Sequence, residues 1–89
     1  MARHMSLEAM SALLASTEAL AHARALRLGT RWYVVRIPGR HGGFEAMDLK
    51  SLRNYFFTPA DAVCSYKRGR DGSVIRTDYA NGKAVRRPS

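Results

Sequence analysis

Cysteine, acidic residues and unbroken apolar stretches are scarce in this sequence, and each scarcity excludes a class of protein. The single cysteine, Cys64, cannot form a disulfide within the chain, so a disulfide-stapled domain is excluded. The longest apolar segment, residues 7–28, contains Glu8 and Glu18 where a membrane helix or a signal peptide requires an uninterrupted hydrophobic run. We therefore expect a cytoplasmic protein that does not enter the membrane.

Residues and motifs that are typical of active sites are also few in this sequence. The three histidines and the one cysteine show no metal-site spacing with acidic residues, and neither a Ser-His-Asp order nor a phosphate-loop motif is present. We therefore expect no metal, no cofactor and no enzymatic activity. A metal-independent ribonuclease that uses Arg, His and Tyr, as in small bacterial toxins, leaves little trace in a sequence and is kept as a third alternative.

The residues that are present are enough for one folded domain. The chain has 89 residues, of which 46% are hydrophobic and 25% charged, as is typical of globular proteins. A core of this size gives modest stability, so a homodimer stays an open alternative. His4-Met5 is what a common cloning junction encodes, which leaves open whether residues 1–4 are native, and the domain is assigned to residues 5–89.

The first third of the chain has the pattern of one long helix. Ser6 can cap its start, and Gly29 supplies the usual stop after Leu28. At 100° per residue, one group of side chains falls on an arc of about 140° and is expected to form the core face. Its members are Leu7, Met10, Leu13, Leu14, Thr17, Leu20, Ala21, Ala25 and Leu28. The opposite side is rich in alanine, which either admits a second helix closely or simply reflects the high helix propensity of alanine.

A β-hairpin and a short helix are expected next. Residues 31–37 are β-branched and aromatic and end before a proline, and residues 44–49 are their expected partner across a glycine-rich loop. Asp48 can cap a short helix that runs through Phe57. Residues 58–61 signal one further helical turn.

The last third has the pattern of a three-stranded antiparallel meander. Strand-like runs cover residues 62–69, 73–80 and 83–87, and they are separated by Asp71-Gly72 and Asn81-Gly82, dipeptides that favour tight hairpins. The complete order is therefore α-β-β-α-β-β-β. This order predicts an α+β fold with the helices on one face of an antiparallel sheet.

Positive charge is concentrated in this meander. The formal net charge is +8, and residues 64–89 contribute +5 of it, with seven basic and two acidic side chains. Two-residue loops would place Lys67 opposite Arg76 and Arg76 opposite Arg87, on a face that also holds Lys83. Like charges opposite each other repel unless an anion lies over them. Such a face is typical of phosphate binding, or of a solvated sheet surface that deters aggregation.

We therefore predict a small basic nucleic-acid-binding module that contacts the phosphate backbone of DNA or RNA through its C-terminal sheet. Arg40, at the tip of the first hairpin, is expected to add a contact. The predicted nucleic-acid-binding residues are Lys67, Arg76, Lys83, Arg87 and Arg40. The next candidates are Arg31, Arg36 and Arg53.

The alternative is a protein-interaction module. A small regulator or inhibitor, encoded by a phage or another mobile element, would dock on an acidic partner or homodimerise through the N-terminal helix. The same positive charge would then steer the chain to a protein surface.

Overall fold

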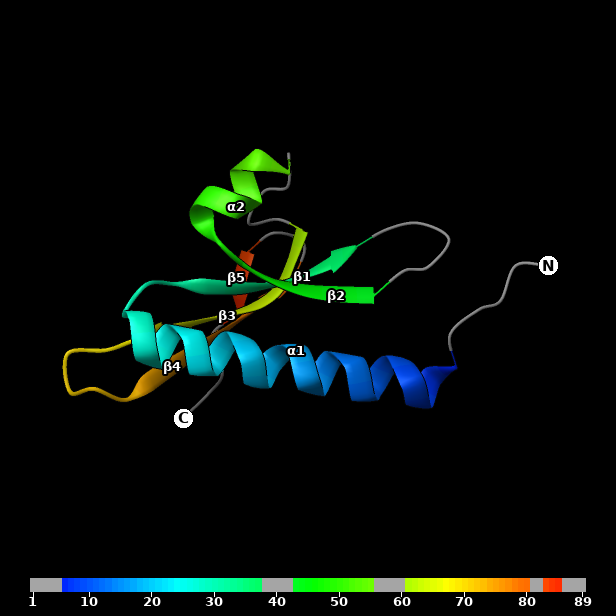
Figure 1. Cartoon of the computed structure of the whole chain (residues 1–89), viewed down its shortest axis with the longest axis horizontal. Coiled ribbons are helices and arrows are strands. Elements are labelled where there is room, and N and C mark those ends of the chain that lie inside the picture. Colours follow the sequence, from blue (N-terminus) through cyan, green and yellow to red (C-terminus); the bar gives the residue numbers. More distant parts are fainter. Residues whose placement is uncertain (1–5, 38–42, 56–60, 81–82, 86–89) are drawn as a thin grey trace.

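In the described part of the chain, helices and strands follow one another in the predicted order (Figure 1). The computed structural model describes residues 6–37, 43–55, 61–80 and 83–85. They form α1 (Leu7–Leu28), β1 (Trp32–Ile37), β2 (Gly43–Asp48), α2 (Leu49–Asn54), β3 (Ala62–Arg68), β4 (Val74–Ala80) and β5 (Lys83–Val85). The strands form one antiparallel sheet in the order β2-β1-β3-β4-β5. The predicted α+β class and element order are therefore confirmed.

The helix α1 begins and ends where the sequence predicts. The Ser6 side chain accepts a hydrogen bond of 3.1 Å from the Ala9 N–H, which satisfies one of the N–H groups that have no partner inside the helix. At the other end Gly29 has a φ of 74°, and its N–H donates to the Ala25 carbonyl at 2.9 Å. Glycine adopts this left-handed conformation at little cost, so the helix stops there.

The buried face of α1 consists of small side chains. Thr17, Ala21 and Ala25 are buried and four residues apart, so they lie in one row along the helix. Small side chains let α1 approach the sheet closely, and larger residues beside the row remain outside the contact. Leu20 is 44% exposed and Leu28 is 50% exposed. The prediction that these two leucines are core residues is therefore wrong.

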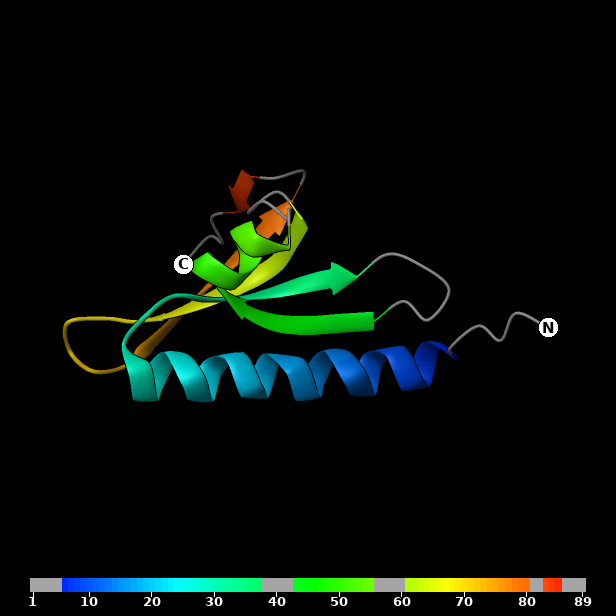
Figure 2. The same ribbon diagram turned by 45° about the horizontal axis from the view of Figure 1, so that its top comes forward.

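The N-terminal turn and the outer side of α1 are exposed. Leu7 is 83% exposed, because the first turn of the helix projects beyond the start of β2 (Figure 1, Figure 2). It is a third predicted core residue that lies outside the core. The alanine-rich side faces solvent, as expected, through Ala9, Ala12, Ala15, Ala19 and Ala23. Pairing of this side with a second copy stays a prediction.

The strand β1 is buried on both of its faces, and the two helices cover opposite sides of the sheet. Val34 lies in a cluster with Ala21 and Ala25 of α1, while Val35 lies in a second cluster with Leu52 of α2. The strands accordingly lie between α1 and α2 (Figure 1, Figure 2). The helices were expected on one face. They lie on two because successive strand residues point to opposite sides, and β1 is apolar on both.

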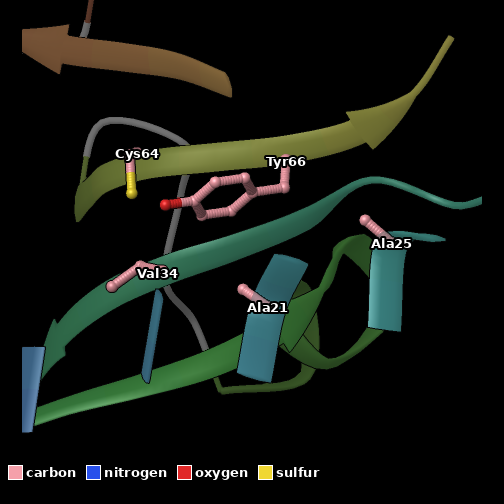
Figure 3. Close-up of a cluster of buried hydrophobic side chains, with 5 residues drawn as sticks. All are labelled: Ala21, Ala25, Val34, Cys64 and Tyr66. Carbon is pink, nitrogen blue, oxygen red and sulfur yellow. The ribbon is translucent and has the colours of Figure 1, made fainter. Parts of the chain in front are cut away.

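The cluster under α1 joins three elements. Figure 3 shows Val34 of β1 and the side chains of Cys64 and Tyr66 from β3, with Ala21 and Ala25 on the nearby turns of α1. Burial raises the pKa of the Cys64 thiol, so this lone cysteine stays protonated and packs as a small apolar residue.

The helix α2 is capped as the sequence predicts. The Asp48 carboxylate accepts a hydrogen bond of 2.8 Å from the Ser51 N–H. The helix covers Leu49–Asn54. The prediction that this helix runs through Phe57 is wrong at Tyr55, which is the C-cap and not a helical residue. Residues 56–57, and most of the turn predicted at residues 58–61, lie outside the described residues.

The register of the β3–β4 hairpin differs from the predicted one by a single residue. Lys67 pairs with Ile75 instead of Arg76, and Arg76 pairs with Tyr66. Because side chains alternate along a strand, this shift moves Lys67 and Arg76 to opposite faces of the sheet. The β4–β5 register is the predicted one, with Ala80 opposite Lys83.

The length of the loop causes this shift. The loop has three residues, 70–72, because the Gly69 N–H donates to the Ser73 carbonyl at 2.7 Å. The Gly72 N–H turns back to the Gly69 carbonyl at 3.1 Å, and Gly72 has a φ of 86°. The Asp71 side chain accepts a hydrogen bond of 3.0 Å from the Ser73 N–H. This arrangement fits a turn closed by a left-handed glycine, so Asp71-Gly72 ends a three-residue loop and does not form a two-residue one.

We expect Ala21→Leu to lower the free energy of unfolding by about 1–3 kcal/mol, because the row of small residues leaves no space for a larger side chain. Ala23→Leu is the matched control. Ala23 is exposed on the same helix, and leucine has a high helix propensity, so its effect should stay within about 0.5 kcal/mol. Urea unfolding followed by circular dichroism measures both variants. Equal losses would contradict the buried face described for α1.

Candidate nucleic-acid interface

The residues predicted to bind nucleic acid do not gather on one face in the described structure. Arg40 and Arg87 lie outside the described residues. Arg76 and Lys83 share the face that α1 covers in part, since Lys83 pairs with Ala80 two positions beyond Asp78. Lys67 lies on the opposite face, toward α2. The prediction that Lys67 shares a face with Arg76 and Lys83 is therefore wrong.

Arg76 connects β4 to α1. Its Nε donates to Asp78 Oδ1 at 2.9 Å, and its Nη1 bonds to the carboxylate of Glu18 on α1. Nη1 also donates to the Tyr66 hydroxyl at 2.9 Å. Partial burial disfavours the charge of Arg76, but its hydrogen bonds to the carboxylates of Asp78 and Glu18 outweigh this effect and raise the pKa of the guanidinium. Two carboxylates thus compensate the charge of Arg76, and this residue has a structural role in joining β4 to α1.

Other arginines on the α1 side also contact the fold itself. Arg24 lies over the Trp32 ring at 4.9 Å, and Arg36 lies over the Phe44 ring at 5.8 Å. The Nη1 group of Arg68 donates to a backbone carbonyl near the end of α1 at 2.9 Å. Cation–π contacts and carbonyl bonds of this kind hold side chains in place. The abundance of arginine is therefore in part structural.

Basic side chains converge on the α2 side of the sheet. Two adjoining pockets, of about 320 and 520 Å³, share Arg31 and Lys67 in their walls. Arg70 also lines the first pocket, and Lys50 also lines the second. We call the hollow formed by Arg31, Lys50, Lys67 and Arg70 the basic groove. It lies where the start of β1, the end of β3 and the start of α2 meet.

Arg31 and Lys67 are neighbours across two strands. At this end of the β1–β3 ladder Trp32 pairs with Tyr66. Arg31 directly precedes Trp32, and Lys67 directly follows Tyr66, so the two cations come next to this pair. Like charges in this position destabilise a sheet. Asp48 also lines the second pocket, and hydrogen bonds from Ser51 lower the pKa of its carboxyl group, so it is ionised. Arg68 also lines the first pocket. The walls of the two pockets thus contain five cations and one carboxylate, which is engaged as a helix cap.

A chain of hydrogen bonds holds the Arg31 side chain in the groove. Its Nη1 donates to the Ser65 hydroxyl at 2.9 Å, and Ser65 is fully buried. The same hydroxyl shares a hydrogen bond of 2.8 Å with the Tyr79 hydroxyl. The Tyr79 ring in turn stacks on Tyr33 at 6.4 Å. A guanidinium has five N–H donors, and this contact with Ser65 uses one of them.

Sequence reasoning missed two members of the groove and ranked a third too low. Lys50 and Arg70 were not candidates, and Arg31 was only a reserve candidate. A three-residue loop after Gly69 would have predicted the face of the sheet on which Lys67 lies. The placement of Arg31 in the same pockets as Lys67 depends on contact between β1 and β3, which are far apart in the sequence and carry no local signal for it.

Comparison of the chain with family models, curated proteins and solved structures gave no match. In the described residues, no three Cys, His, Asp or Glu side chains lie together as a metal site would require. The described part of the chain also contains no helix of the length and apolarity that a membrane span needs.

We expect the stability of the fold to fall as the pH rises from 10 to 12, in part because of Tyr66. Burial is the main cause that raises the pKa of Tyr66 from 10.0 to about 12. The unfolded chain loses the hydroxyl proton of Tyr66 at a lower pH than the folded chain does. The contribution of Tyr66 to the free energy of unfolding is therefore complete below pH 10 and is lost as the pH rises through the folded pKa. The loss should reach up to about 2 kcal/mol.

Urea unfolding of the wild type and of Tyr66→Phe across this pH range measures the effect. The variant loses hydrogen bonds at every pH, but its stability should fall less steeply. Tyr55→Phe is the control, because Tyr55 is 66% exposed. Parallel pH profiles for the wild type and Tyr66→Phe would contradict this role of Tyr66.

Proposed function

We propose that this chain is a nucleic-acid-binding module that contacts the phosphate backbone through the basic groove. The observation that carries the proposal is the position of Arg31 and Lys67, side by side in the shared wall of two pockets. An anionic ligand between them would replace their mutual repulsion by attraction on both sides. Phosphodiesters offer such an anion at every step of a nucleic-acid strand.

Two further features support a phosphate ligand. The Arg31 guanidinium is planar and already oriented by Ser65, and such a group can bind two phosphate oxygens at once with little loss of conformational entropy. The formal net charge of +8 raises the rate of encounter with any polyanion. A cytoplasmic protein would meet both DNA and RNA, and the same groove chemistry serves either backbone.

The test compares cations on the two faces of the sheet. Lys67→Gln and Arg70→Gln each remove one charge from the groove. Lys83→Gln removes the same charge from β5, where Lys83 is exposed on the other face. Fluorescence anisotropy with duplex DNA and with single-stranded RNA, at several salt concentrations, gives the slope of log K against log salt. Circular dichroism confirms that each variant is folded.

We expect each groove substitution to reduce the magnitude of this slope by about 0.7–0.9, which is the value for one lost phosphate contact. Lys83→Gln should leave the slope unchanged. If Lys83→Gln has the same effect as Lys67→Gln, the binding surface is not the groove. If the wild type binds neither polymer at low salt, the proposal is wrong, and an acidic protein surface becomes the favoured partner.

A further inference from the structure

The basic groove offers apolar surface as well as charge. Ile75, which is 58% exposed, lines the first pocket together with Thr77. Leu49, which is 39% exposed, lines the second pocket together with Tyr33. Exposed aliphatic side chains contribute nothing to the binding of phosphate, which needs only donors and positive charge. A ligand that fits both kinds of surface has apolar faces beside its phosphates.

The order of these surfaces along the groove is regular. The cation pair Arg31 and Lys67 belongs to both pockets, so it separates the apolar residue Ile75 on one side from Leu49 on the other. Both pockets fall within the range of roughly 300–1,000 Å³ that is usual for sites of small organic groups. The groove therefore has one exposed aliphatic side chain in each hollow, with the pair of cations between the two hollows.

A single strand of nucleic acid has the same alternation. Each phosphodiester lies between two nucleosides, and unpaired bases can splay out and rest on protein side chains. A duplex stacks its bases in its interior and presents phosphates on a convex outer surface, so its bases cannot enter the hollows. We infer that the groove binds single-stranded nucleic acid, with a phosphodiester between Arg31 and Lys67 and an unpaired base on Ile75 or Leu49 at either side. This inference rests on the proposed phosphate binding.

The experiment separates the contribution of the bases to the affinity from that of the phosphates. Four ligands of equal length are titrated at one low salt concentration: oligothymidylate, oligouridylate, an abasic deoxyribose-phosphate strand and a DNA duplex. We expect at least one of the two single strands with bases to bind about tenfold or more tightly than the abasic strand and the duplex, because contacts of bases add to those of the backbone.

Variants of the apolar residues locate the contact. Ile75→Ala and Leu49→Ala should each weaken binding of that single strand about three- to tenfold and leave the abasic strand unaffected. Both side chains are partly exposed, so the fold tolerates their truncation. Val85→Ala is the matched control, because Val85 is a 45% exposed strand residue that lines neither pocket. It should leave all four affinities unchanged.

The outcomes distinguish this inference from the proposed function. Equal binding of the abasic strand and both base-carrying strands overturns the inference and leaves phosphate binding intact. Tighter binding of the duplex, or equal effects of Ile75→Ala, Leu49→Ala and Val85→Ala, also overturns it. Absence of binding to all four ligands overturns both.

Discussion

The burial of β1 on both faces is the constraint on which the rest of the structure depends. Val34 supports α1 and Val35 supports α2, so one strand of six residues joins the two parts of the core. The same strand pairs with β2 along one edge and with β3 along the other. Arg31 directly precedes this strand, and its place is therefore set by the most enclosed element of the fold. Sites built on such elements are more precise than sites on loops.

Basic residues have different surroundings on the two sides of the sheet. On the α1 side, guanidinium groups lie over aromatic rings or bond to carboxylates and a carbonyl, as Arg24, Arg36, Arg68 and Arg76 show. On the α2 side, cations share a groove with a single capping carboxylate. Net charge alone does not separate these two uses. The groups that each basic side chain contacts distinguish the two cases.

The sequence was sufficient for the elements and insufficient for their contacts. Caps are local, so Ser6, Gly29 and Asp48 mark helix ends correctly. The hairpin register depends on whether Gly72 ends a loop of two residues or of three, and a dipeptide does not decide this. One residue of difference moved Arg76 toward α1 and left Lys67 on the other face. The groove itself requires the pairing of β1 with β3, which is non-local.

The contrast between Arg76 and Arg31 explains why one is structural and the other is proposed to bind a ligand. Arg76 donates to two carboxylates, which orient it and also cancel its charge. Arg31 donates to the hydroxyl of Ser65, a neutral acceptor that orients the guanidinium and leaves its charge in place. A neutral partner thus fixes the orientation of the guanidinium without cancelling its positive charge. A charged group held in this way attracts an anion strongly. The repulsion from Lys67 adds to this condition, because an anion bound between the two cations would relieve it.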